Sequence, residues 1–256
     1  MMTSYLGRHA ELYDIIYADK DYSAEARFVH EQLQRHRRGA VVRILELACG
    51  TGRHAMALEA LGYSIVATDH SEDMLTVARA RAAVTKSQVQ FRHADMRQLG
   101  TDFAGFDGAI CLFDSIGYVR TNEAIEATLS GVVRALRPGG VFLCEFWHAG
   151  AMLKSFEPVR VKRWRTPSGE LLRVTETQID CERQLATVNY ELLELCADGM
   201  YSRTRETQVN RFFLVREMRL FLENSGLEPV RFLAGFTDSE NIDEHTWHVI
   251  AVACRL

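Results

Sequence analysis

The sequence has no CxxC pair, no long apolar run and no excess of basic residues. Its six cysteines, without such a pair, favour free thiols in a reducing compartment over disulfides or a zinc site. Charged side chains interrupt residues 1–17, and no later apolar run is long enough to span a bilayer, so we expect neither a signal peptide nor a membrane anchor. These absences together predict a cytoplasmic protein.

Acidic residues slightly outnumber basic ones, with 34 Asp and Glu against 30 Lys and Arg and a formal net charge of -4. Without a global basic field, the chain is not expected to bind nucleic acid or an anionic membrane. Its 256 residues, 47% of them hydrophobic, suffice to bury the core of one large domain with a modest insertion. A small molecule is therefore the expected partner.

Two helices are expected over residues 10–38, followed by an alternation of strand and helix patterns. The predicted strands are 41–48, 64–69, 89–95, 106–113 and 140–147, and the helices between them begin at Arg53, Ser71 and Asn122. Such alternation is typical of parallel strands joined by crossover helices. We therefore predict an α/β fold with a doubly wound, Rossmann-like sheet and N-terminal helices.

The pattern becomes β-rich after Trp147. Four stretches, separated by turn residues, read as strands: 158–165, 170–180, 184–196 and 201–213. A helix over 214–224 and strands near 229–234 and 247–254 then return the chain to the main sheet. The sequence thus predicts a cofactor-binding domain at 1–150 and 214–256, with an antiparallel β insertion at 151–213 that covers the substrate site.

A glycine-containing motif, Glu46-Leu-Ala-Cys-Gly50-Thr-Gly52, joins the first predicted strand to the next helix. Gly50 and Gly52 permit a tight turn with close backbone approach to a ligand, and Asp69 ends the next strand, where a ribose diol would bind. The same pattern fits an NAD(P)-dependent oxidoreductase. Glu46 favours a different cofactor, because a carboxylate would repel a pyrophosphate and attract the ammonium and sulfonium of S-adenosylmethionine.

Three further segments occur at the spacing of this cofactor site. Asp95 and Met96 follow the third strand, where the carboxylate can accept a hydrogen bond from the adenine amino group and Met96 can pack on the ring. Leu112-Phe113 ends the fourth strand beside the adenosine. The segment Leu136-Arg137-Pro138-Gly139-Gly140 is expected to form the turn before the fifth strand.

In this order, the motifs resemble those of the class I S-adenosylmethionine-dependent methyltransferases over nearly the whole chain. Softer motifs resemble the branch that includes nucleotide-sugar N,N-dimethyltransferases of deoxyaminosugar pathways. They lie at 12–17 (LYDIIY), 21–25 (DYSAE), 71–75 (SEDML) and 115–118 (SIGY). The β-rich insertion and the closing Trp247-His248 strand are also similar to that branch.

The resemblance implies a seven-stranded sheet in the order 3-2-1-4-5-7-6, with an antiparallel seventh strand and N-terminal helices that cap the cofactor. S-adenosylmethionine is the implied cofactor. The residues expected to bind it are Tyr13, Tyr22, Glu46, Ala48, Gly50, Gly52, Asp69, His70, Met74, Asp95, Met96, Leu112 and Phe113. The segment from Glu145 to His148 is expected to face the methyl acceptor.

Methyl transfer to a neutral amine needs little acid–base chemistry, because the sulfonium is already activated. Transfer to a hydroxyl would need a general base, for which Glu145, His148 and Tyr13 are the candidates. The residues expected to bind the acceptor are Tyr17, Trp147, Arg163 and Arg165.

Two of these assignments have structural alternatives. Arg163 and Arg165 belong to a basic cluster with Arg160 and Lys162 that would suit a diphosphate, or would form an exposed basic strand edge. Tyr17 lies one helical turn from Tyr13, which also fits an amphipathic helix packed on the sheet.

Several questions stay open at this point. The fourth strand is not followed by the Asn/Asp-Pro-Pro-aromatic run of enzymes that methylate bases and amides, which argues against DNA or glutamine as acceptor. His245 and His248, near Asp243 and Glu244, lack the spacing of a zinc site, so we expect a solvated turn and no metal. An oxidoreductase, a non-catalytic cofactor-binding protein, another metabolite or macromolecule as acceptor, N- or O-methylation and a homodimer all remain compatible with the sequence.

Overall fold

The central sheet has seven strands in the order β10-β11-β5-β4-β1-β2-β3. The computed structural model describes residues 7–37 and 39–256, so Arg38, the last residue of the predicted helical stretch, lies outside the described residues. The strands are β1 (Arg43–Leu47), β2 (Ser64–Asp69), β3 (Gln90–His93), β4 (Phe106–Cys111), β5 (Leu136–Trp147), β10 (Leu227–Ala234) and β11 (His248–Arg255). β1 to β5 pair in parallel, and β11 runs antiparallel between β5 and β10. The predicted strand order is confirmed.

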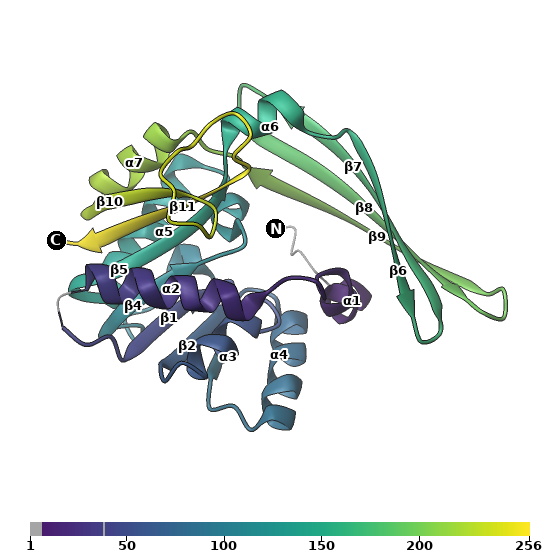
Figure 1. Ribbon diagram of the computed structural model, residues 1–256, viewed down its shortest axis with the longest axis horizontal. Helices are drawn as coiled ribbons and strands as arrows, with labels where there is room; N and C mark the ends of the chain where they lie inside the picture. The colour runs from purple at the N-terminus through teal and green to yellow at the C-terminus, as the bar shows by residue number, and fades with distance from the viewer. Residues whose placement is uncertain (1–6, 38) are drawn as a thin grey trace.

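Helices cover both faces of this sheet (Figure 1). They are α2 (Tyr22–His36), α3 (Arg53–Glu59), α4 (Glu72–Thr85), α5 (Asn122–Ala135) and α7 (Val215–Asn224), with short 3-10 turns η1 (Met96–Gln98) and η2 (Ser115–Tyr118). Side-chain caps fix the starts of α2, α4 and α5. Asp21 accepts a hydrogen bond from Ala24 N, Ser71 accepts one from Met74 N, and Thr121 accepts one from Ala124 N. Among the described residues, no helix has the length and apolar character needed to cross a bilayer.

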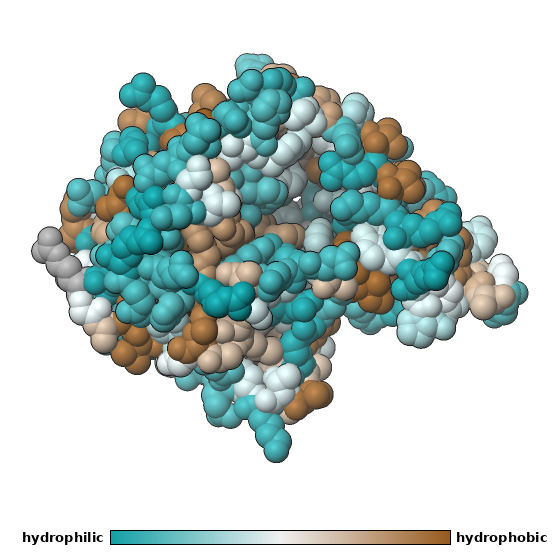
Figure 2. Space-filling model, in the orientation of Figure 1, coloured by the Kyte–Doolittle hydropathy of each residue, from teal (hydrophilic) through white to brown (hydrophobic). Residues whose placement is uncertain are grey.

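The β-rich segment after β5 forms a second, four-stranded antiparallel sheet in the order β6-β7-β8-β9. It follows α6 (Ala149–Ser155) and consists of β6 (Val159–Thr166), β7 (Gly169–Asp180), β8 (Leu185–Cys196) and β9 (Tyr201–Arg211). These strands agree closely with the predicted stretches. The sheet extends away from the α/β body as an arm (Figure 1), and a hollow separates the two on the face shown in Figure 2.

The N-terminal helix α1 (Arg8–Ile16) lies against one face of this arm. Leu12 and Ile16 of α1 pack with Leu171 of β7 and Leu192 of β8, and all four side chains are buried. Because side chains alternate along a strand, only every second residue of β6 to β9 shares this inner face. The remaining residues form the outer face of the arm.

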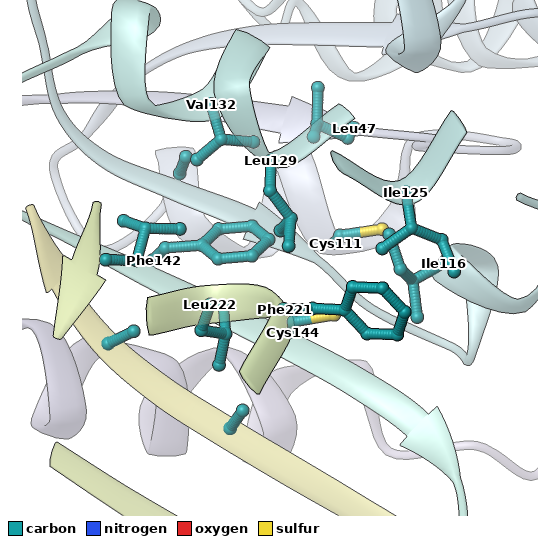
Figure 3. Packing of buried hydrophobic residues seen from close by; sticks show 14 of the residues in the cluster. Leu47, Cys111, Ile116, Ile125, Leu129, Val132, Phe142, Cys144, Phe221 and Leu222 are labelled. Carbon is teal, nitrogen blue, oxygen red and sulfur yellow. The ribbon is translucent and has the colours of Figure 1, made fainter. Parts of the chain in front are cut away.

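Two apolar layers hold the main sheet between its helices. On one face, Leu129 and Val132 of α5 and Leu222 of α7 pack with Phe142 of β5 in a fully buried cluster (Figure 3). On the other face, a second cluster joins the strands to α2 and α3. Each large apolar side chain removed from water in this way contributes roughly 1.5–3 kcal/mol.

The segment Leu136 to Gly140 differs from its prediction as a turn, because β5 already begins at Leu136. Leu136 pairs with Phe106, and the next paired residues are Gly108 and Val141, so the intervening residues of β5 bulge out of the ladder. Pro138 lies in the bulge, where its missing N–H costs no ladder hydrogen bond.

Gly52 has a packing role that the sequence did not reveal. Its φ of +74° is left-handed, and a Cβ at this position would lie 2.6 Å from the ring of Phe91. Gly52 does not line the cleft described below, unlike Gly50. The expectation that Gly52 contacts the cofactor stays a prediction, and the structure adds a packing role: the missing side chain lets Phe91 of β3 pack beneath the turn.

We predict that Gly52→Ala destabilises the protein by about 2–4 kcal/mol, from backbone strain together with overpacking against Phe91. The matched control is Gly62→Ala, because Gly62 also has a left-handed φ, of +95°, but a Cβ there meets nothing within 4 Å. It should cost only the strain, about 1–2 kcal/mol. Urea unfolding measures both, and equal losses would contradict the packing role.

Candidate functional site

A cleft lies beyond the carboxyl ends of the parallel strands, where open α/β sheets bind their ligands. It encloses about 1370 Å³ of empty space, its open mouth included. Residues that follow β1 to β4 form its floor, Tyr13 of α1 and Tyr22 of α2 line it from above, and Thr207, Gln208 and Val209 of β9 line it from the arm. All predicted cofactor-binding residues except Gly52 line this cleft.

Two carboxylates lie at adjacent strand ends in the floor. Asp69 accepts hydrogen bonds from the backbone N–H groups of Gly50 (2.7 Å) and Ser71 (2.8 Å), which fixes the glycine turn. Glu46 is 2% exposed, and its Oε2 has no hydrogen-bond partner. Burial, reinforced by the charge of Asp69, raises the pKa of Glu46 to about 8. This floor therefore favours a cationic ligand.

Arg53 and Tyr22 lie side by side at another part of the cleft lining. The guanidinium of Arg53, the first residue of α3, lies 4.3 Å from the centre of the Tyr22 ring. The Tyr22 hydroxyl is buried without a hydrogen-bond partner, and burial raises its pKa. Together they offer donors to a carboxylate. Sequence analysis missed Arg53, although its position directly after the glycine turn was the available signal.

Asp95 and His70 mark a further part of the lining. Asp95 is ion-paired with Arg97, which holds its pKa below the usual range. The His70 ring stacks on that of His93, with centroids 5.6 Å apart. Neither interaction was foreseen from the sequence. Met74 packs with Ala10 and Tyr13, so α1 and α4 meet at the cleft.

Of the three predicted general bases, only Tyr13 lines the cleft. Burial raises its pKa well above the usual value, so it stays a neutral phenol. Glu145 lies beneath the cleft, where Oε2 accepts a hydrogen bond from Phe113 N (2.6 Å). His148 begins α6, and its Nδ1 lies 3.1 Å from the carbonyl oxygen of Thr246. The structure therefore does not place Glu145 or His148 at the cleft surface.

The predicted acceptor-binding residues divide by position. The Tyr17 ring lies 4.6 Å from that of Tyr13 and 4.9 Å from that of Phe113, directly behind the cleft lining. Trp147 packs at the root of the arm, against the cluster that includes Met152 and Phe212. Neither residue lines the cleft.

Arg163 and Arg165 are on the outer face of the arm, opposite to Trp164 and α1. Arg163 is 62% exposed and is ion-paired with Glu170 at 3.6 Å. Their expected contact with the acceptor is therefore not supported by the structure. The alternative weighed from the sequence, an exposed basic strand edge, describes them instead.

Comparisons with known proteins identify the family of this chain. A family model described as "Methyltransferase domain" matches residues 44–140. A Geobacillus sp. protein assigned to the methyltransferases is 30% identical over 228 residues, which make up 88% of this chain and 90% of that protein. The chain belongs to the class I S-adenosylmethionine-dependent methyltransferases.

Two further similarities concern the fold and the branch of this family. An S-adenosylmethionine-dependent methyltransferase from Clostridium acetobutylicum has a TM-score of 0.83 at 20% identity, covering 97% of this chain and 98% of that one. A dTDP-3-amino-3,4,6-trideoxy-alpha-D-glucopyranose N,N-dimethyltransferase of Streptomyces venezuelae is 35% identical over 143 residues, 54% of this chain and 57% of that protein. The methyltransferase fold thus extends over the arm as well as the sheet.

One feature of this methyltransferase was not expected from its sequence: His248 is not part of a solvated turn. Its Nδ1 lies 2.9 Å from Asp114 and 3.2 Å from Glu145, and both carboxylates are buried. The charge of Asp114 raises the pKa of His248 to about 11, against the opposite effect of burial. An imidazolium therefore compensates two buried carboxylates directly below Phe113.

We predict that His248→Gln destabilises the methyltransferase at pH 7 by about 1.5–3 kcal/mol, because it removes a charged hydrogen bond to buried acids. The pKa of His248 is raised on folding, so its contribution is complete below about pH 6.5 and is lost as pH rises through about 11. The difference in Tm from the wild type should therefore shrink between pH 7 and pH 10.

The matched control is His245→Gln, because His245 is 69% exposed three residues away. Its Tm should equal that of the wild type at both pH values. A His248 variant as stable as this control would show that Asp114 and Glu145 need no compensating charge.

Proposed function

We propose that this methyltransferase binds S-adenosylmethionine in the cleft and methylates an amine of a small molecule, with a nucleotide-linked amino sugar as the acceptor. The observation that carries the proposal is the distribution of charge in one cleft. The carboxylates of Glu46 and Asp69 lie in its floor, and a guanidinium beside the buried phenol of Tyr22 lies elsewhere in the lining. S-adenosylmethionine has the complementary groups: an ammonium, a sulfonium and one carboxylate.

Each group of this cofactor has a complementary residue in the lining of the cleft. Glu46 has an orphaned oxygen for a cation, and Asp69 is the acceptor for the ribose hydroxyls. Arg53 and the Tyr22 hydroxyl would hold the methionine carboxylate. Met74 and Leu112 offer apolar contact to the adenine. The bound cofactor supplies an activated methyl group, and the chain aligns the acceptor with it and excludes water.

An amine acceptor is favoured over a hydroxyl by the groups around Tyr13. A hydroxyl nucleophile needs a base, and Tyr13 is held neutral by burial while Glu145 is bonded to Phe113 and His248. An unprotonated amine has its own lone pair and needs only orientation. Tyr13 and Tyr118, which both line the cleft, have hydroxyls that can orient such a nitrogen.

The acceptor class is supported by the relative that acts on a dTDP-linked amino sugar. It is also supported by the arm, which places Thr207, Gln208 and Val209 in the lining of the cleft. Tyr118 donates a hydrogen bond to Gln208 (2.7 Å), so the arm is fastened to η2 across the cleft. A polar acceptor covered in this way is shielded from water during transfer.

We predict that S-adenosylmethionine binding at pH 7 releases a proton, because Glu46, with a pKa of about 8 in the free protein, ionises beside the cationic ligand. Affinity should therefore rise with pH up to about 8, by at most about tenfold per pH unit, and level off above it. Calorimetry in buffers of different ionisation enthalpy measures the released proton.

Glu46→Gln should abolish this proton release and flatten the pH dependence, whereas Glu228→Gln, at an exposed position of β10, should change neither. If the Glu46→Gln variant still released a proton, another group would be its source. The pKa of Glu46 would then no longer support a cationic ligand at the floor.

The proposed reaction is tested by incubating the protein with S-adenosylmethionine and dTDP-linked amino sugars, with the matching dTDP-linked neutral sugars as controls. Mass spectrometry should show addition of methyl groups to the amino sugars only. Methylation of the neutral sugars would establish O-methylation instead. If neither is methylated while S-adenosylhomocysteine binds, the acceptor class is wrong and the cofactor assignment stands.

A further inference from the structure

Arg173, on the inner face of the arm, is a buried cation without an anionic partner. Its side chain belongs to β7, and the residue is 7% exposed. Nη1 donates a hydrogen bond to the Tyr17 hydroxyl (3.3 Å), and Nε has no partner. Within residues 7–37 and 39–256, no carboxylate lies within ion-pair distance of this guanidinium. A charge removed from water in this way is costly unless something pairs with it.

Arg211 is an equally buried arginine of this chain, and it has a counter-ion. It is also 7% exposed, but its Nη2 is ion-paired with Glu217 at 2.5 Å. Glu206, which shares the inner face with Arg173, does not fill that role: its Oε2 lies 2.9 Å from His9 Nδ1, and its Oε1 accepts from Gln208. Arg173 thus lacks the counter-ion that Arg211 has.

Aromatic rings surround the guanidinium, and Nε is left without a hydrogen-bond partner. Its carbon lies 5.7 Å from the ring centre of Tyr17, 5.3 Å from that of Trp164 and 5.6 Å from that of Tyr190. Such contacts stabilise a cation by roughly 0.5–2 kcal/mol each but supply no counter-charge. Rings on several sides also hold the planar fork in one orientation.

The position of Arg173 relative to the cleft decides which ligand it faces. Tyr17 joins the two, because its ring lies next to Arg173 on one side and 4.9 Å from Phe113 on the other. Arg173 is thus on the arm, one ring behind the cleft lining and apart from Glu46 and Asp69 in the floor. Lys162 lies opposite Arg173 in the strand register and adds positive charge to the same face.

We propose that Arg173 binds an anionic group of the methyl acceptor, a phosphate or a carboxylate, and so restricts the methyltransferase to acceptors that carry one. The identification of the ligand as the acceptor rests on the proposed function. The guanidinium fork matches the geometry of two acceptor oxygens, and the anion supplies the missing counter-charge. This role belongs to the inner face of the arm, not to Arg163 and Arg165 on the outer face.

The test uses the full chain saturated with S-adenosylhomocysteine and three probes: inorganic pyrophosphate, thymidine diphosphate and succinate. Calorimetry should show binding of at least one probe to the wild type and at least tenfold weaker binding to Arg173→Gln. Preference for the phosphate probes or for succinate distinguishes the two sources of the anion. Arg205→Gln is the matched control, because Arg205 is 68% exposed on the outer face and paired with Glu191.

Affinity for S-adenosylhomocysteine should be the same in all variants, which shows that each is folded. If Arg173→Gln does not fold, Arg173→Lys keeps the charge but loses the planar fork, and at least threefold weaker binding is expected. Binding of no probe to the wild type, or equal loss in Arg205→Gln, would overturn the proposal. Because these measurements need no turnover, they are independent of whether the proposed methylation occurs.

Discussion

Two carboxylates at the ends of neighbouring strands, the buried Glu46 and the half-buried Asp69, set the conditions for the rest of this cleft. Each carboxylate oxygen of Asp69 accepts a hydrogen bond from a backbone N–H group, one from Gly50 and one from Ser71, and these bonds stabilise its negative charge. Glu46 has no such compensation for one oxygen. The turn that holds Asp69 thereby also fixes the position of the unsatisfied acid, and the remaining lining is complementary to a ligand that carries both signs of charge.

The helix α1 connects this floor to the arm. On one side Asp14 accepts a hydrogen bond from Thr51 (3.0 Å) in the glycine turn and is ion-paired with Arg81 of α4. On the other side Arg8 is ion-paired with Glu194 of β8 at 2.5 Å, and His9 contacts Glu206 of β9. One short helix thus holds together the two halves of the cleft, which come from separate sheets.

The sequence predicted what depends on periodicity and on short-range motifs. The strands, the arm and the cleft lining near Glu46, Asp69 and Phe113 follow from hydrophobic alternation and from the rule that ligands bind beyond strand ends, whereas the strand order was implied by the family resemblance. It failed where distant segments meet. His248 finds Asp114 and Glu145 only through the pairing of β11 with β5, and Phe91 reaches Gly52 only through the packing of β3.

In the arm, too, the sequence pattern of a single strand could not predict contacts with distant segments. Alternation separates Arg163 and Arg165 from Lys162 and Trp164, but nothing local tells which set faces inward. That choice is made by α1, whose apolar side chains cover one face. Arg173 was overlooked for the same reason, since its burial depends on Tyr17 from a helix far away in the sequence.

The position of α1 also has a mechanical consequence. Because it is bonded to the glycine turn and to the arm at once, a movement of α1 that uncovers the floor also breaks its contacts with β8 and β9. The floor of the cleft and the arm are therefore mechanically coupled through α1, so that neither set of its contacts would be broken alone by a displacement of the whole helix.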